Sequence, residues 1–224
     1  MSLEVKDYRV RWRLSEEGVA RRKGRLATDE DCTLLIRRAA RFLDVQGRPL
    51  LVYLPGVLKQ EMEEAYSVLT TIRAATENRG LASGTEARTP QGNHFRGKPV
   101  SSAIVGSFEG SGYYKTCRLT SWTRKELSGR WPQLAPLLQA CARVFEEYQP
   151  DRYARQMEFV LRTQPDWILP GTPFSTCTVN NSYPTGYHQD DGDLGEGFSV
   201  LAVARRGNYE GGVLTLPESG LGVD

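Results

Sequence analysis

The residues best suited to chemistry in this chain are His188 and Asp190, which are separated by one position. Side chains two positions apart on an extended strand point to the same face, so this imidazole and this carboxylate can bind one metal ion together. One histidine and one carboxylate are two of the three ligands in the 2-His-1-carboxylate triad that holds non-haem Fe(II). The only other histidine, His94, lies in a long stretch without periodicity, where a solvated or substrate-facing side chain is expected rather than a metal ligand.

Short segments of strand and turn character flank this pair. Thr176, Thr178 and Asn180 alternate with other residues in a predicted strand, and their shared polar face is expected to line a cavity. Further strands are predicted at residues 198–204 and 211–217, each after a glycine-containing turn. The pattern predicts an α+β fold with an incomplete double-stranded β-helix, or jelly roll, as its core and with N-terminal helices packed on the sheet.

Residues 178–193 (TVNNSYPTGYHQDDGD), with residues 211–217 (GGVLTLP) behind them, resemble the 2-oxoglutarate/Fe(II)-dependent dioxygenase superfamily. The H-x-D-x-G-D form is most similar to the TET/J-binding-protein branch, including its phage and bacterial members. This resemblance implies an enzyme that uses Fe(II), 2-oxoglutarate and O₂ to hydroxylate the methyl group of a DNA base, either 5-methylcytosine or thymine. It therefore also implies that DNA is the partner of this chain.

The resemblance implies roles for individual residues as well. His188 and Asp190 are expected to bind Fe(II), with the second ring nitrogen of His188 held by a hydrogen-bond acceptor. Asn181 and Tyr183 stand where related dioxygenases often set polar side chains against 2-oxoglutarate, and the alternative for them is a turn asparagine and a packed tyrosine. Asp193 is expected to fix the turn rather than to bind the metal.

Two parts of the implied site are missing from the sequence. The superfamily places a distal histidine, and an arginine or lysine that pairs the far carboxylate of 2-oxoglutarate, on late jelly-roll strands. No histidine follows His188 in this chain. We therefore expect the sequence to be a fragment with little activity of its own, and the alternatives are that another chain completes it or that it is not an oxygenase.

A DNA base must leave the stack before it can reach an enclosed iron site. Arg118, Trp122 and the predicted loop at residues 78–112 are the candidates for contacting such a substrate. Basic residues near the N-terminus form either a solvated face or a surface that binds phosphates. They are Arg9, Arg11, Arg13, Arg21, Arg22, Lys23 and Arg25.

Two other functions stay open. The first is a 2-oxoglutarate-dependent hydroxylase of a protein side chain or a small molecule, and it is distinguished by whether the basic segments flank the iron cavity. The second is a non-catalytic jelly-roll binding domain, which has no distal histidine. Extension of the reading frame distinguishes this second alternative, because an oxygenase needs the distal histidine.

The composition indicates which class of protein this is but not which partner it binds. The 224 residues are 39% hydrophobic and 25% charged, with a net charge of only +2, which suits a globular chain and does not by itself indicate a nucleic-acid binder. Four widely spaced cysteines without a C-x-x-C pair predict buried free thiols and a reducing compartment. No apolar run is long enough to span a membrane. We expect a cytoplasmic protein, or a nuclear one if the source is eukaryotic.

The chain is predicted to form a single domain over residues 1–224, with an N-terminal elaboration over residues 1–112 and the jelly-roll half over residues 113–224. Periodicity and capping signals predict the elements of both parts. Strands are predicted at residues 10–14, 50–54 and 113–123, and helices from Thr28 to about residue 42 and at residues 59–75, 132–148 and 151–161. The helix at residues 132–148 is expected to pack on the jelly-roll sheet.

Overall fold

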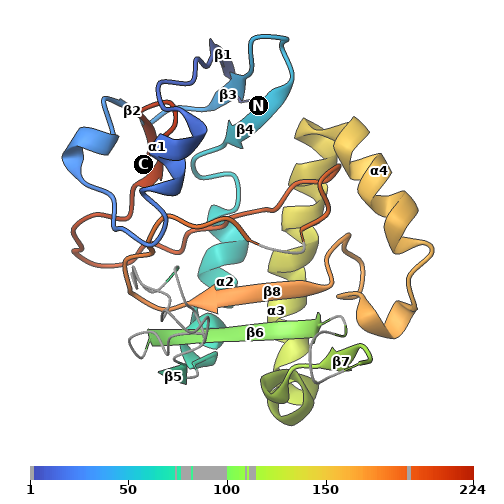
Figure 1. Cartoon of the computed structure of the whole chain (residues 1–224). Coiled ribbons are helices and arrows are strands. Elements are labelled where there is room, and N and C mark those ends of the chain that lie inside the picture. Colours follow the sequence, from blue (N-terminus) through green and yellow to red (C-terminus); the bar gives the residue numbers. More distant parts are fainter. Residues whose placement is uncertain are drawn as a thin grey trace.

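A computed structural model describes residues 3–73, 75–76, 82, 100–108, 110, 115–190 and 193–224 of the chain. Within these residues the chain forms an α+β fold with three small sheets and two long helices that stand behind one of them (Figure 1). His94 and most of the predicted loop at residues 78–112 lie outside the described residues.

The sheet next to the candidate metal residues is built around β6 (Val100–Phe108). It pairs antiparallel with β8 (Thr176–Asn180), and it also pairs with β5 (Ala75–Thr76) and β7 (Arg118–Leu119). The helices α2 (Lys59–Thr71) and α3 (Ser121–Tyr148) cover one face of this sheet (Figure 1). The core between sheet and helices is formed by apolar side chains of α2, α3, β6 and β8, among them Val68, Val105, Leu134, Leu138 and Val179.

The prediction of a loop at residues 78–112 is wrong over β6. This strand is buried along most of its length, and small residues such as Ser102, Ala103 and Gly106 occupy it in place of an alternating apolar pattern. Gly106 adopts φ +114, and a Cβ atom there would lie 2.1 Å from the carbonyl oxygen of Ser175. Only glycine allows the two backbones to approach so closely.

The N-terminal residues form the two other sheets together with the last strands of the chain. One sheet has the order β1 (Lys6–Arg9), β3 (Ala40–Leu43), β4 (Pro49–Tyr53). The other has the order β2 (Leu34–Ile36), β10 (Leu221–Val223), β9 (Leu214–Leu216). A second core cluster joins the two sheets, and it contains Val10, Ile36, Ala40, Phe42, Leu221 and Val223. Residues at opposite ends of the sequence therefore share one apolar core.

Two N-terminal predictions are wrong. The predicted strand at residues 10–14 is irregular, and Trp12 is 58% exposed. The helix predicted from Thr28 is only the 3-10 turn η1 (Asp29–Asp31), although the capping box of Thr28 and Asp31 is present. The apolar residues that follow pair as β2 and β3, because strand pairing with distant partners outweighs their helical spacing. A short helix, α1 (Glu16–Ala20), precedes this region.

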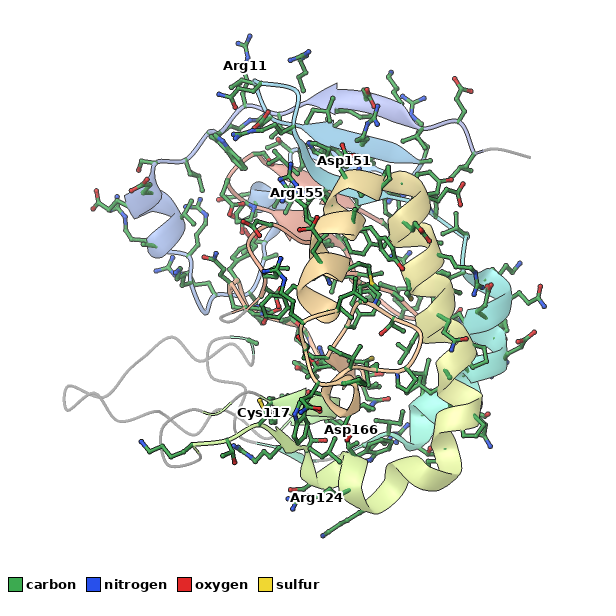
Figure 2. All side chains as sticks on the ribbon, turned by 90° about the vertical axis from the view of Figure 1, so that its right-hand side faces the viewer. Arg11, Cys117, Arg124, Asp151, Arg155 and Asp166 are labelled. Carbon is green, nitrogen blue, oxygen red and sulfur yellow. The ribbon has the colours of Figure 1, made fainter. Side chains whose placement is uncertain are left out.

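The helices of the central part agree with the predictions better than the strands do. α2 begins as predicted and ends at Thr71, and α4 (Pro150–Val160) is confirmed. α3 begins at Ser121 rather than after Pro132, because Thr120 caps it by accepting a hydrogen bond from the Thr123 backbone N–H. The helix bends along its length (Figures 1 and 2), and it contains two internal prolines, Pro132 and Pro136. Of the predicted strand at residues 113–123, the described residues from 115 onward form only β7.

Beyond β8 the predicted strands are only partly present. The strand at residues 176–180 is confirmed as β8, and a strand within residues 211–217 is confirmed as β9. Residues 198–204 form no strand, and Leu201 and Val203 are 71% and 63% exposed. A 3-10 turn, η3 (Pro165–Trp167), links α4 to the segment before β8. Among the helices described, none combines the length and the apolarity that crossing a lipid bilayer requires.

Candidate active site

His188 and Asp190 lie together even though their segment is not a strand. Residues 181–190 are irregular, so the predicted extended geometry is wrong, but Nε2 of His188 is 3.5 Å from Oδ1 of Asp190. Nδ1 of His188 is 2.8 Å from the carbonyl oxygen of Gly186. A carbonyl oxygen only accepts hydrogen bonds, so Nδ1 of His188 carries a proton, and in the neutral form of the ring Nε2 is the unprotonated nitrogen that faces the carboxylate.

This pair fits two neighbouring ligand positions of a metal ion. Two ligand atoms about 2.1 Å from one metal and at right angles to each other lie about 3 Å apart. The observed 3.5 Å separation of Nε2 and Oδ1 is close to this value. The Gly186 carbonyl supplies the acceptor that ligating histidines use to fix their ring. Among the residues that the structure describes, no third histidine, cysteine or carboxylate completes a metal-binding group.

Asn181 anchors the start of this segment to the fold. Its backbone N–H donates to the carbonyl oxygen of Ser101 at 2.9 Å, and its side-chain amide donates to the carbonyl oxygen of Ile72 at 3.0 Å. Ile72 caps the C-terminus of α2 and is fully buried. Asn181 therefore connects α2, through its side-chain amide, and β6, through its backbone N–H, to the segment that carries His188.

The residue before His188 is held by the N-terminal part of the chain. The backbone N–H of Tyr187 donates to the Arg25 carbonyl at 2.8 Å, and the Tyr187 carbonyl accepts from the Gly24 N–H at 2.7 Å. The Tyr187 hydroxyl is buried near Asp31 and Thr215 and makes no hydrogen bond to a described residue. Burial raises the pKa of Tyr187 and the Asp31 carboxylate raises it further, so the hydroxyl stays protonated.

Asp31 is the centre of a small network beside Tyr187. Its carboxylate accepts a hydrogen bond from Nε of Arg22 at 3.1 Å and another from the backbone N–H of Thr28 at 2.9 Å. Burial alone raises the pKa of Asp31, but the hydrogen bonds from Thr28 and Arg22 outweigh it and leave that pKa below its usual value. Arg22 is therefore turned inward to Asp31, unlike the exposed Arg21 and Lys23 beside it.

The polar face expected on β8 is present in part. Val179 and Cys177 of β8 pack into the core, so Thr176, Thr178 and Asn180 share the opposite face. Asn180 accepts hydrogen bonds at Oδ1 from the Ser102 hydroxyl at 2.7 Å and from the Tyr183 hydroxyl at 3.1 Å. The hydroxyl of Tyr183 thus lies at the end of this polar face.

Arg118 and Trp122 are not brought to His188. Arg118 pairs in register with Phe108 at one end of β6, whereas Asn180 pairs with Ser102 near the other end. The six residue steps from Ser102 to Phe108 span about 20 Å of strand. Arg118 lies over the Phe108 ring, and Trp122 packs against the core.

Sequence reasoning missed the network beside the His188–Asp190 pair. The Thr28–Asp31 capping box is a visible signal, but on its own it predicts the start of a helix and not a turn beside Tyr187. The basic residues 21–25 stand out in the sequence for their charge alone. Asp193, expected to fix the turn, accepts a hydrogen bond from the hydroxyl of Ser199.

Comparison with known proteins identifies the family. The chain is 33% identical to thymine dioxygenase JBP1-B of Trypanosoma cruzi over 203 residues, which is 89% of this chain and 22% of that protein. It is 33% identical to thymine dioxygenase JBP1 of Leishmania tarentolae over 132 residues, which is 58% of this chain and 15% of that protein. The matched part of the chain thus corresponds to about a fifth of the first relative's length and to a smaller share of the second relative's length.

A third relative combines two activities in its name. The chain is 31% identical over 146 residues to the bifunctional helicase and thymine dioxygenase JBP2 of Trypanosoma brucei brucei, which is 64% of this chain and 13% of that protein. The Tet_JBP family model, described as the oxygenase domain of the 2OGFeDO superfamily, matches residues 103–224. Because this match covers more than half of the chain and includes His188 and Asp190, the chain belongs to the Tet_JBP family of 2OGFeDO oxygenase domains.

Proposed function

We propose that this chain is the part of a 2-oxoglutarate- and Fe(II)-dependent dioxygenase that hydroxylates the methyl group of thymine in DNA. The observation that carries the proposal is the convergence of Nε2 of His188 and Oδ1 of Asp190, with the proton of His188 held at Nδ1 by Gly186. The relatives at 31–33% identity are named thymine dioxygenases, which favours thymine over 5-methylcytosine as the base.

In this proposal the chain's own residues bind the metal ion and orient 2-oxoglutarate. When bound together, Fe(II) and 2-oxoglutarate activate O₂ for attack on a C–H bond. His188 presents a neutral Nε2 to the metal, and Asp190 supplies the negative charge that helps to neutralise it. We place Tyr183 next to 2-oxoglutarate, at the end of the polar face of β8. The amide of Asn181 is used by the Ile72 carbonyl, so Asn181 acts there only through the position of its neighbours.

The basic segment at residues 21–25 supports DNA as the substrate. Gly24 and Arg25 are hydrogen-bonded to Tyr187, so this segment runs beside the residue that precedes His188. Gly24 has φ +85 and is buried, while Arg21 and Lys23 are exposed. Exposed cations next to the proposed metal site suit phosphates on either side of an extruded base. A protein or small-molecule substrate does not need such a flank.

The finer features of the fold are proposals too. We propose that β6 and β8 belong to a jelly roll. Residues 1–224 then form a single domain, because the N-terminal sheets share a core with β10. All four cysteines are free thiols, which suits a reducing compartment that contains DNA, the cytoplasm or a nucleus.

The experiment compares two DNA duplexes that differ only in the methyl group. One contains thymine and the other contains uracil at the same positions, and succinate release is measured with Fe(II) and 2-oxoglutarate present. We expect succinate and a base heavier by one oxygen atom only from the thymine duplex, and neither from the His188→Ala variant. Equal succinate release from both duplexes contradicts DNA-base hydroxylation and favours a protein or small-molecule substrate.

A further inference from the structure

We propose that Tyr187, Asp31 and Thr215 are positioning residues of the metal site, through which the N-terminal arm (residues 22–31) sets the orientation of His188. This inference rests on the proposed function, because it takes His188 as a metal ligand. It adds that the site depends on residues outside the matched oxygenase region at residues 103–224.

The backbone contacts fix the peptide group from which His188 extends. The Tyr187 carbonyl oxygen and the His188 nitrogen belong to the same planar peptide unit. The hydrogen bond of 2.7 Å from Gly24 to this oxygen therefore sets the plane in which the His188 backbone begins. The second hydrogen bond, of 2.8 Å from Tyr187 to Arg25, prevents rotation of the preceding unit.

The side chain of Tyr187 joins three distant segments. Its hydroxyl is buried and lies near the Asp31 carboxylate and the Thr215 side chain, and it makes no hydrogen bond to a described residue. Asp31 belongs to the N-terminal arm and Thr215 belongs to β9. The backbone hydrogen bonds to Gly24 and Arg25 hold Tyr187 at this place, so its ring stays packed between the N-terminal arm and β9.

Asp31 is itself held in place, so it can act as a fixed support. Arg22 and Thr28 donate to its carboxylate, and its side chain is only 10% exposed. Its neighbour Asp29 is exposed in the same 3-10 turn. The same substitution at Asp29 therefore controls for a change of charge in this turn.

The first experiment measures the affinity of the protein for Co(II) alone, as a stable substitute for Fe(II). Loss of a group that orients a ligating histidine typically weakens metal binding by about 10–100-fold. We expect Tyr187→Phe, Thr215→Val and Asp31→Asn each to raise the Kd for Co(II) by about tenfold, the low end of this range. The Asp29→Asn variant should match the parent. The double variant Tyr187→Phe/Asp31→Asn should lose no more Co(II) affinity than either single variant does, because both changes remove the same contact.

The second experiment needs no metal. Long-range ¹H–¹⁵N spectra distinguish the two neutral forms of a histidine ring, and this chain has only two histidines. In the parent we expect His188 to hold its proton at Nδ1, as the contact with Gly186 requires. In Tyr187→Phe and Asp31→Asn we expect a mixture of both forms, with the Asp29→Asn spectrum unchanged. A purely structural role of Tyr187 lowers the melting temperature without changing this ratio.

The outcomes separate this proposal from the proposed function. If His188→Ala loses Co(II) binding while Tyr187→Phe, Thr215→Val and Asp31→Asn all keep the parent Kd and proton position, the positioning role is overturned and the metal site stands. If His188→Ala binds Co(II) as well as the parent does, the metal site itself is overturned. Should Asp31→Asn fail to fold, Tyr187→Phe and Thr215→Val decide the matter, since each changes only one hydroxyl group.

Discussion

The side-chain amide of Asn181 donates a hydrogen bond of 3.0 Å to the carbonyl oxygen of Ile72, across more than a hundred positions of the sequence. This hydrogen bond satisfies the carbonyl group at the end of α2 and connects the helix to the segment that leads to His188. We expect Asn181→Ala to lower the free energy of unfolding by about 1–3 kcal/mol, because it leaves a buried carbonyl without its donor. Urea denaturation measures this change.

The control for this variant is Asn208→Ala, which removes the same side chain from an exposed turn. It should unfold like the parent. If Asn181→Ala unfolds like the parent but no longer binds 2-oxoglutarate, Asn181 is a direct cosubstrate ligand and its assignment to the fold is wrong.

Gly106 and Gly129 make a matched pair for the close approach of β6 to the segment before β8. We expect Gly106→Ala to destabilise the protein by more than about 2 kcal/mol, because its φ of +114 and the Ser175 carbonyl both exclude a methyl group. Gly129 lies in α3 with open space around its Cα, so Gly129→Ala should stabilise by about 0.5–1 kcal/mol. Thermal melts of both variants check the prediction, and a loss at both positions contradicts it.

The cysteines should differ widely in their reaction with iodoacetamide. Burial raises the pKa of Cys141 to about 12, helped by nearby Cys177 and Glu61, and burial of its thiol against the core raises the pKa of Cys177 to about 11. At pH 8 about one thiol in a thousand or fewer is then ionised at either position. We expect the exposed Cys117 to react first, and Cys141 and Cys177 to react only after unfolding. Mass spectrometry of the peptides measures each rate, and rapid native labelling of Cys141 contradicts the packing of α3.

The pairing of His188 with Asp190 could be predicted from the sequence because it depends only on the types of the two residues and on their spacing. The strand geometry assumed for the pair was wrong, but a carbonyl two residues before His188 still orients its ring. α2, α4 and β8 could be predicted for the same reason, since each shows its periodicity within one short segment.

The parts that could not be predicted depend on distant partners. Leu34 pairs in register with Leu221, and nothing in the local sequence around either residue indicates the other. β6 lacks a periodic apolar pattern because small residues such as Ser102 and Gly106 are buried in it beside the apolar ones. The proximity of Tyr187 to Asp31 and Thr215 requires three segments to meet, so it becomes visible only in the folded chain.

The network around Asp31 should make the protein sensitive to acid. The folded-state pKa of Asp31 lies below its ordinary value of 3.8, so its contribution to stability is present above that pH and is lost as the pH falls through the folded value. We expect the melting temperature of Asp31→Asn to fall less steeply than that of the parent below pH 3.8. Asp29→Asn is the control and should keep the parent slope. Equal slopes in the parent and in Asp31→Asn contradict a lowered pKa at this carboxyl.

The basic segment beside Tyr187 predicts a salt-dependent interaction with DNA. Arg21 and Lys23 are exposed, whereas Arg22 is bound to Asp31. We expect Arg21→Gln/Lys23→Gln to weaken binding to duplex DNA and to reduce the slope of log K against log salt by about 0.9 for each phosphate that the variant no longer neutralises. Fluorescence anisotropy at several salt concentrations measures both. The control is Arg155→Gln/Arg162→Gln on and after α4, which lies across the molecule from this segment (Figure 1). An equal effect in the control means that net charge, and not the surface beside His188, determines DNA binding.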